Sequence, residues 1–189
     1  MPRLLLINGL PGSGKSTLAA RYVADRPLAL CLDVDVVRGL LGAWTDHPHD
    51  AGLLARRLAL GMARVVLAEG HDVVVPQFLA RPRFVEELEA LAAEVGAEFV
   101  EVVLVQEPDV AAARLAERAA GPMTDVQRDA HAMLDRAGGL AAVPELHRRL
   151  RDLLARRPHA RRVEPVPGDV EATYRELLSS IGPAATSLL

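Results

Sequence analysis

Short apolar runs alternate along the chain with longer amphipathic stretches, and this alternation predicts strands and helices in turn. Runs rich in Val or Leu predict strands over Arg3–Asn8, Leu28–Asp33, Asp72–Pro76, Glu98–Val105 and Arg161–Val166. Helical spacing predicts helices over Ser16–Asp25, Val36–Leu41, Ala51–Glu69, Pro82–Val95, Asp109–Ala119, Asp125–Arg136, Glu145–Arg156 and Val170–Ser180. Strands that alternate with helices favour a parallel sheet with helices on both faces.

The composition is that of one globular domain. Half of the 189 residues are hydrophobic and a quarter are charged, which excludes wholesale disorder. The net charge of −3 argues against a protein that coats nucleic acid or a membrane surface. No apolar run approaches the roughly 18 residues of a membrane span. We expect one domain over 1–182, a loose tail over 183–189, and a reducing cytoplasm in which the single cysteine, Cys31, is a small core residue.

The basic residues are unevenly divided between the two types. Of 22 Lys and Arg residues, 21 are arginine and Lys15 is the one lysine. Arginine serves as the surface cation elsewhere, so a lysine that persists indicates a site that needs a compact ammonium on a flexible stem.

Lys15 belongs to a stretch that fits G-x-x-x-x-G-K-[ST] at every fixed position. Its residues are Gly9, Leu10, Pro11, Gly12, Ser13, Gly14, Lys15, Ser16 and Thr17. The predicted strand before it and helix after it are the context in which backbone N–H groups curl around phosphate oxygens. Lys15 would reach the β- and γ-phosphates of ATP, and the Ser16 hydroxyl would bind Mg²⁺. The motif therefore predicts a nucleotide site.

Other classes of P-loop protein fit less well. A guanine-reading Asn-Lys-x-Asp element is excluded, because the only asparagine is Asn8 and the only lysine is Lys15. None of the apolar strands ends in the Asp-Glu pair of motor and clamp ATPases, so a hydrolytic ATPase is possible but unsupported.

Two carboxylates follow the second predicted strand. Asp33 and Asp35 are two residues apart, so both project to one side while the chain stays extended. A kinase needs a carboxylate there to accept the proton of the acceptor hydroxyl, and a second carboxylate often holds magnesium through water. Arg38 lies near Asp35 on the following helix, where it can clamp a polar acceptor. The alternative is that Asp35 caps a helix that begins at Val36.

These two segments carry a resemblance. From Leu4 to Arg38, the chain resembles the kinase domain of polynucleotide 5′-kinases in its glycine-rich loop and its later Asp35-x-x-Arg38. It is also similar to chloramphenicol phosphotransferase and zeta-toxin kinases, which share the dipeptide present here as Val34-Asp35. The resemblance implies that Asp35 deprotonates an acceptor hydroxyl, and that Arg38 contacts the acceptor phosphate as the corresponding arginine does in the polynucleotide kinases. The implied fold is the three-layer P-loop NTPase fold of nucleoside-monophosphate-kinase type, with a five-stranded parallel sheet and a small helical lid.

The lid is expected near 114–139. Arg114 and Arg118 lie four residues apart on one helix face, before a Gly-Pro break and a helix that carries Arg128. The pattern is similar to the lid of the same kinases, where arginines close over the transferring phosphoryl group. It predicts Arg118 as a catalytic residue, Arg114 beside it on the nucleotide, and Arg128 on the acceptor side. The alternative is a solvated helix face.

The acceptor side departs from the polynucleotide kinases. Gln77 follows the third strand where related kinases often have Asp, and it offers a donor and an acceptor but no charge. This fits a neutral hydroxyl-bearing molecule, and Trp44 is a candidate flat wall for it.

Seven arginines between 148 and 162 would suit nucleic acid, but the intervening leucines favour the solvated face of an amphipathic helix.

The sequence therefore predicts an ATP- and Mg²⁺-dependent phosphotransferase that acts on a hydroxyl of a small molecule. Asp33, Asp35, Arg38, Trp44, Gln77 and Arg128 are its candidate acceptor residues. A polynucleotide 5′-hydroxyl kinase and a nucleotide-dependent switch ATPase remain alternatives, and the oligomeric state stays open. No membrane partner is expected.

Overall fold

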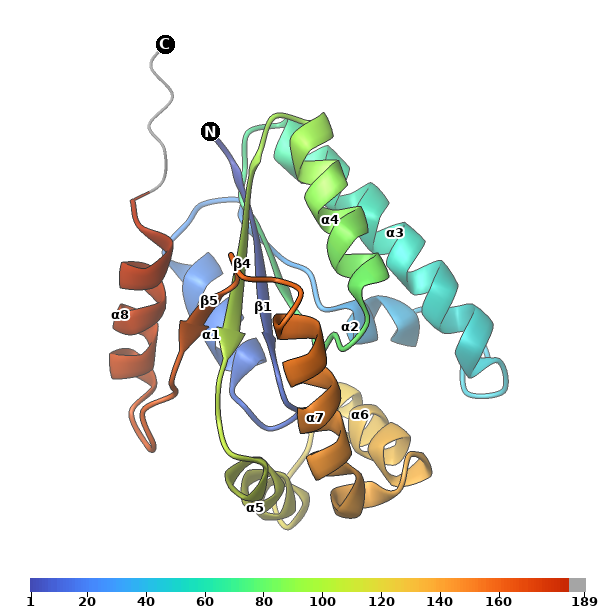
Figure 1. Ribbon diagram of the computed structural model, residues 1–189. Helices are drawn as coiled ribbons and strands as arrows, with labels where there is room; N and C mark the ends of the chain where they lie inside the picture. The colour runs from blue at the N-terminus through green and yellow to red at the C-terminus, as the bar shows by residue number, and fades with distance from the viewer. Residues whose placement is uncertain (184–189) are drawn as a thin grey trace.

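The computed structural model describes residues 1–183, and its centre is a five-stranded parallel sheet (Figure 1). The strands are β1 (Arg3–Gly9), β2 (Leu30–Cys31), β3 (Val73–Pro76), β4 (Glu98–Leu104) and β5 (Arg161–Val163). Their order is β2-β3-β1-β4-β5, and every adjacent pair is parallel. The strand that carries the glycine-rich loop is therefore the central one.

Helices cover both faces of this sheet, as the sequence predicts. Alternate residues of a strand point to opposite faces, and β1 shows this directly. Leu4 and Leu6 pack against α3 (Pro48–Ala68) and α4 (Pro82–Glu94), whereas Leu5 and Ile7 pack against α1 (Lys15–Ala24) and α8 (Val170–Ile181). The three-layer α/β fold is confirmed.

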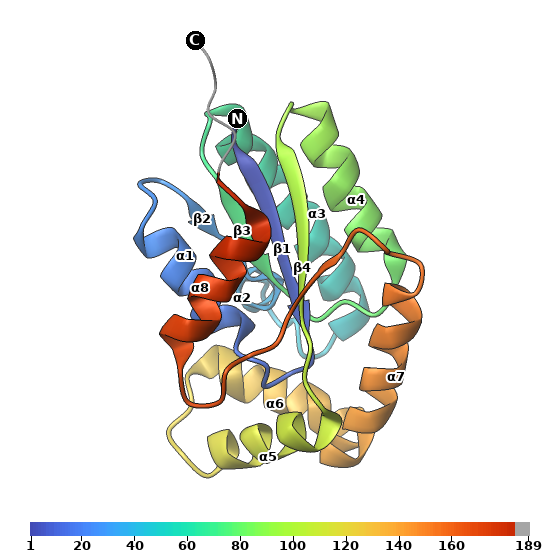
Figure 2. The ribbon, with the colours of Figure 1, turned by 60° about the vertical axis from the view of Figure 1, so that its left-hand side comes forward.

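The remaining helices lie at and beside the carboxyl end of the sheet (Figure 2). They are α2 (Val34–Gly39), α5 (Pro108–Ala119), α6 (Asp125–Arg136), the 3₁₀ turn η1 (Gly139–Ala142) and α7 (Val143–Leu154). A separate apolar cluster joins Leu10 of the glycine-rich loop to Leu115 of α5, Leu134 of α6 and Leu150 of α7. The segment predicted as a lid thus packs against the phosphate loop. Residues 184–189, most of the predicted tail, lie outside the described residues.

Several predicted boundaries are wrong for local reasons. The second strand is limited to Leu30–Cys31, because Leu28 has a left-handed φ of 63° that no strand contains. Cys31 is exposed rather than buried, because β2 is the edge strand. The last strand ends at Val163 instead of Val166, and Pro165 in the missing part has no N–H for a sheet.

The start of α2 changes the assignment of the two carboxylates. The helix begins at Val34, and the Asp33 side chain caps it by accepting a hydrogen bond from the Asp35 N–H at 2.9 Å. Asp35 lies in the first turn of the helix, so the chain does not stay extended through it and Asp35 is not the cap. The expected start of the helix, Val36, was therefore wrong by two residues.

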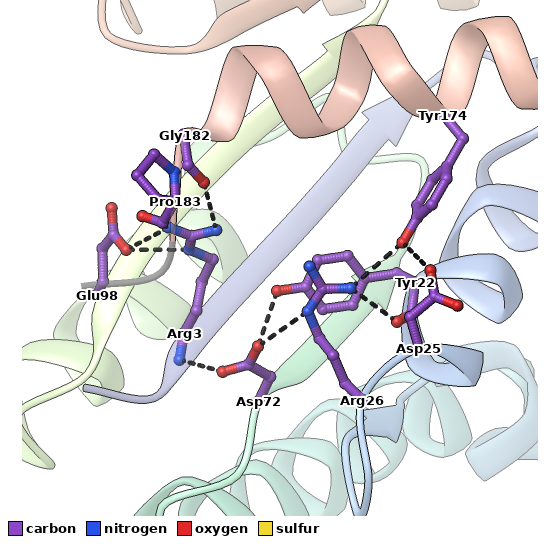
Figure 3. A network of polar contacts seen from close by, with 9 residues as sticks. All are labelled: Arg3, Tyr22, Asp25, Arg26, Asp72, Glu98, Tyr174, Gly182 and Pro183. Carbon is purple, nitrogen blue, oxygen red and sulfur yellow. Dashed lines mark hydrogen bonds and ion pairs between the residues drawn. The ribbon is translucent and has the colours of Figure 1, made fainter. Parts of the chain in front are cut away.

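A polar network ties together the amino end of the sheet, opposite the glycine-rich loop (Figure 3). The Asp72 carboxylate accepts a hydrogen bond from the Arg3 backbone N–H at 2.8 Å and one from the Tyr22 hydroxyl at 2.8 Å. The Arg26 guanidinium lies 3.6 Å from the same carboxylate and stacks on the Tyr22 ring at 3.7 Å. One carboxylate therefore fixes β1, β3 and the end of α1 relative to one another.

The network continues to the last helix. The Arg3 guanidinium donates to Glu98 Oε2 at 2.8 and 2.9 Å, and to the carbonyls of Gly182 and Pro183 just after α8. The Tyr174 hydroxyl of α8 donates to Asp25 at 3.1 Å. Elements far apart in sequence are thus locked at the edge of the sheet away from the loop.

No helix within residues 1–183 combines the length and the apolar character that a membrane crossing requires.

Tyr22 gives this network a measurable pH dependence. Burial, followed by the nearby Asp72 carboxylate, raises the pKa of Tyr22 from 10.0 to about 12. Because the unfolded phenol ionises first, we expect the free energy of unfolding to fall as pH rises from about 10 towards about 12. Denaturant titrations at several pH values measure this, and Tyr22→Phe removes that part of the fall. Tyr174→Phe is the control and keeps it; an identical pH profile for Tyr22→Phe and the native chain would contradict the prediction.

Candidate active site

The glycine-rich loop turns sharply between β1 and α1, and its backbone requires glycine. Gly12 and Gly14 have φ values of 83° and 93°, in the left-handed region that side chains disfavour. A Cβ on Gly12 would also lie 3.0 Å from the Ala111 carbonyl oxygen of α5. Gly14 is the N-cap of α1, so the first N–H groups of that helix are free to face an anion.

Lys15 lies at the base of this loop and is buried. Its ammonium donates to the Leu10 carbonyl oxygen at 2.8 Å, a bond that closes the loop on itself. Burial lowers the pKa of Lys15 to about 8; the charges of Asp33 and Asp35 oppose this shift, and the charge of Arg118 adds to it. The structure thus brings the predicted catalytic residues, Lys15, Asp35 and Arg118, into one electrostatic environment.

A cavity of about 380 Å³ opens beside the loop. Gly12–Gly14 and Thr17 form one wall, and Arg114 and Arg118 of α5 form another. This places both predicted lid arginines on the nucleotide side. Ligand sites in parallel sheets lie at this carboxyl edge, and the cavity is of ligand size.

The third wall of the cavity was missed by sequence reasoning. It consists of the segment 165–170 between β5 and α8, together with Thr173. The Val166 N–H donates to Thr173 Oγ1 at 2.9 Å, and this hydroxyl donates to the Asp169 carbonyl oxygen at 3.0 Å. Pro165 and Pro167, directly after the last strand, are the sequence signal that could have indicated a shaped loop at this edge.

Gln106 was also missed as a site residue. It follows β4, and its Oε1 accepts a hydrogen bond from Arg114 at 3.3 Å. The Gln106 Nε2 is buried and has no hydrogen-bond partner among residues 1–183. Gln106 therefore positions Arg114 at the cavity wall.

The predicted acceptor residues other than Arg128 gather around Asp35. Arg38 Nη1 lies 2.9 Å from Asp35 Oδ1, and Gln77 Nε2 lies 3.5 Å from Asp35 Oδ2. The Trp44 ring lies over the Arg38 guanidinium, 4.6 Å from its centre. Asp33 is half-buried, and burial, with Asp35 as a second cause, raises its pKa. Three side chains, from α2, from the segment after it and from the end of β3, thus surround the Asp35 carboxylate or its arginine partner.

Arg128 and Ser16 do not take part in the contacts around Asp35 that the structure describes within residues 1–183. Arg128 contacts Asp125 and the Met123 carbonyl oxygen in its own segment, so its recorded contacts do not join it to the other acceptor residues. Ser16 is exposed at the second position of α1, where its hydroxyl can face a ligand.

The oxygen donors near the loop fit a magnesium ion that a nucleotide brings with it. The Ser16 hydroxyl and the Asp33 carboxylate are hard oxygen ligands, which Mg²⁺ prefers while keeping several waters and substrate phosphates. Within residues 1–183, no cluster of three or more His, Cys, Asp or Glu side chains could hold a metal ion on its own. A metal here would therefore depend on phosphate oxygens as well.

A phosphate loop after the central strand of a five-stranded parallel sheet, with helices over the loop, defines a nucleotide-binding P-loop protein of kinase-type fold. A family model described as an AAA domain, AAA_33, matches residues 4–139, and the chain belongs to this family. The expected resemblance to P-loop kinases is confirmed at this level.

Curated relatives are longer proteins. The uncharacterised protein Rv2004c of Mycobacterium tuberculosis H37Rv is 37% identical over 131 residues, which cover 63% of this chain and 26% of the relative. An uncharacterised protein of Mycobacterium bovis, Mb2027c, matches to the same extent. The chain thus spans about a quarter of the length of the curated relatives it matches.

Solved structures share the fold at low sequence identity. A gluconokinase from Sinorhizobium meliloti 1021 has a TM-score of 0.62 at 18% identity, over 95% of this chain and 91% of the other. The tunicamycin resistance protein of Deinococcus radiodurans has a TM-score of 0.60 at 16% identity, over 96% of each chain. A chain of the Pnkp1/Rnl/Hen1 RNA repair complex has a TM-score of 0.59 at 16% identity, over 82% of this chain and 46% of the other. These likenesses show the fold alone.

The buried position of Lys15 predicts that no other cation can replace it. We expect Lys15→Ala to lower turnover by roughly 10² or more through lost stabilisation of developing phosphate charge. Lys15→Arg should also fail, because a planar guanidinium does not fit the space from which the ammonium reaches Leu10. Nucleotide affinity by calorimetry and phosphate release measure the effect, and near-normal activity of Lys15→Arg would refute the argument.

Proposed function

We propose that the protein is an ATP- and Mg²⁺-dependent phosphotransferase that moves the γ-phosphoryl group to a hydroxyl of a small molecule, with Asp35 as general base. The observation that carries this proposal is the charge arrangement around Lys15. Asp35, a carboxylate that is tied to Arg38 and Gln77, opposes the lowering by burial of the pKa of Lys15 at the base of the phosphate loop. A phosphoryl donor and a hydroxyl acceptor can meet between these two groups.

The donor half follows from the loop. Its N–H groups and Lys15 would hold the β- and γ-phosphates, while Arg114 and Arg118 would face the nucleotide from α5. Ser16, with Asp33 nearby, would hold Mg²⁺, which when bound neutralises charge that develops on the phosphate oxygens. We propose ATP rather than GTP, because the chain has no Asn-Lys-x-Asp element to read guanine.

The acceptor half centres on Asp35. Its Oδ1 is engaged by Arg38, whereas Oδ2 has only a long contact with Gln77. In the proposed step, Oδ2 takes the hydroxyl proton as the hydroxyl oxygen bonds to the γ-phosphorus. The bond between that phosphorus and the β–γ bridging oxygen then breaks, and ADP leaves. Asp33 serves the metal and the helix cap rather than the proton.

A small-molecule acceptor is supported over nucleic acid by the arginine-rich segment. Arg148 and Arg149 pair with Glu145, and Arg157 pairs with Glu101 and Glu89. Leu150, Leu153 and Leu154 form the buried stripe of α7. Three of the seven arginines therefore have acidic partners already, and Arg161 donates to the Ser180 carbonyl oxygen. A cytoplasmic location, expected from the cysteine content, stays a prediction.

The test of the function is ADP formation from Mg–ATP with and without hydroxyl compounds, followed by detection of labelled phosphate on the acceptor. A kinase is stimulated by its acceptor and labels it. Stimulation by 5′-hydroxyl oligonucleotides alone would indicate a polynucleotide kinase, and slow hydrolysis that no acceptor changes would indicate a switch ATPase. Either result would overturn the proposal.

The two carboxylates give a paired prediction. Asp35→Asn keeps the size of the side chain and leaves the helix cap on Asp33 intact, but it removes the base, so we expect transfer to fall roughly 10²–10⁴-fold. Asp33→Asn should keep the cap, because Asn caps about as well as Asp, and should act mainly by raising the magnesium requirement. Initial rates across a magnesium titration measure both. If Asp35→Asn transfers normally and Asp33→Asn does not, the two roles are reversed.

The arginines of α5 give another prediction. Arg118→Ala should lower kcat with little change in ATP affinity, because the guanidinium acts on charge that develops during transfer. Arg114→Ala should have a smaller effect of the same kind. Arg136→Ala, an arginine in the last turn of α6, is the surface control. Steady-state rates and equilibrium ATP binding separate the two effects, and normal turnover of Arg118→Ala would place this arginine outside the reaction.

A further inference from the structure

Two polar atoms beside Asp35 are buried and lack a hydrogen-bond partner within residues 1–183. They are Arg38 Nε, a donor, and Gln77 Oε1, an acceptor. Both side chains use another atom to contact the same Asp35 carboxylate, and only 8% of the Arg38 side chain is exposed. Native proteins pair nearly all buried polar groups. A donor and an acceptor left unpaired beside one carboxylate therefore indicate a ligand.

The orientation of the Gln77 amide follows from Asp35. A carboxylate oxygen accepts hydrogen bonds, so the NH₂ group faces Oδ2 and the amide oxygen faces away. The unpaired atom of Gln77 is thus an acceptor that needs a donor from elsewhere. The unpaired atom of Arg38 needs an acceptor.

Trp44 stacks on the arginine of this pair. Its ring lies over the Arg38 guanidinium, and the preceding residue, Ala43, has a left-handed φ of 49°, which is strained for a residue with a Cβ. Neither unpaired atom is accessible to solvent in this conformation. A ligand therefore reaches them only after a local rearrangement, such as the release of Trp44 from Arg38 as the bend at Ala43 relaxes.

The charges restrict the chemistry of that ligand. An anion would suit Arg38 Nε but would meet the carboxylate of Asp35 and the amide oxygen of Gln77. An ammonium would suit those two groups but would meet the guanidinium of Arg38. A hydroxyl group both donates and accepts and carries no charge, so it satisfies Gln77 and Arg38 together.

We propose that these residues form the acceptor subsite and that it takes a neutral polyol with adjacent hydroxyl groups. This inference rests on the proposed function, because one hydroxyl faces Asp35 and receives the phosphoryl group. The neighbouring hydroxyl donates to Gln77 Oε1 and accepts from Arg38 Nε. Trp44 then lies against the C–H face of the polyol instead of against Arg38.

Trp44 is the only tryptophan of the chain, so its fluorescence reports on the subsite without any turnover. The neutral probes are D-sorbitol, ribitol and glycerol. Each is compared with the acid of the same carbon chain, namely D-gluconate, D-ribonate and D-glycerate. D-glucamine is the amine probe. All probes are titrated into the protein with Mg²⁺ and a non-hydrolysable ATP analogue. We expect a saturable change with at least one neutral polyol, at least tenfold tighter than with its acid. Tighter binding of an acid or the amine, or no saturable change with any neutral polyol up to about 10 mM, ten times an ordinary upper KM, would overturn the proposal.

Substitutions of Gln77 show whether this residue recognises the polyol or has only a structural role. Gln77→Leu should abolish the polyol response while the analogue still binds. Gln77→Glu should reverse the preference, so that D-glucamine binds at least tenfold tighter than D-sorbitol, which a structural residue would not cause. Arg38→Met should weaken the polyol response, and Arg83→Met, at a surface pair with Glu87, is the matched control. An unchanged polyol response in Gln77→Leu would contradict the subsite.

ADP formation measured in the presence of the same probes separates a failure of the subsite from a failure of the phosphotransferase function. Transfer to an acid but to no neutral polyol would leave the phosphotransferase standing and refute the neutral subsite. A saturable polyol response without transfer to any probe would leave the subsite standing and refute the hydroxyl-kinase function.

Discussion

The parallel direction of all five strands is the constraint on which the rest of the structure depends. Because the strands run the same way, the segments that follow them meet at one edge of the sheet. The phosphate loop after β1, Asp33 after β2, Gln77 after β3, Gln106 after β4 and Pro165 after β5 all lie there. No local interaction brings these residues together, and each arrives from a different part of the chain.

The amino ends and the carboxyl ends of the strands have different roles. At the amino edge, the polar network around Asp72 and Arg3 leaves its hydrogen-bonding groups paired (Figure 3). At the carboxyl edge, buried polar atoms of Ser13, Arg38, Gln77 and Gln106 are unpaired within residues 1–183, and Glu101 Oε1 is the one further case outside that edge. Unpaired groups reduce stability, so their concentration at one edge indicates that ligands complete it. The paired end holds the sheet in place, and the other end leaves polar groups available to a ligand.

The parts of the candidate site differ in how far they could be predicted from the sequence. The phosphate loop is contiguous, and its strand, glycines and lysine could be recognised together. The Asp35–Arg38 pair spans one helical turn and was also accessible to sequence reasoning. The cap was misplaced because capping by Asp33 or by Asp35 differs by only two residues of backbone, which composition does not resolve. Thr173 and Gln106 were missed although their partners lie within eight residues along the chain, because residue types alone do not reveal the shape of the loop after β5 or the turn from β4 into α5. Cys31 was misjudged because an apolar run does not reveal whether its strand lies at an edge.

The proposed donor half of the site consists mainly of backbone groups, and the proposed acceptor half consists of side chains. This difference explains why a shared fold says little about the acceptor. The donor half is largely backbone: N–H groups of the loop, the carbonyl of Leu10 that holds Lys15, and the end of a helix. A likeness of fold concerns the backbone, and proteins at 16–18% identity share the overall fold with TM-scores near 0.6. The acceptor half consists of side chains, on α2, after β3 and in the exposed segment that carries Trp44. Side chains can change without any change of fold, so the acceptor must be inferred from the donors, acceptors and charges that this chain itself places around Asp35.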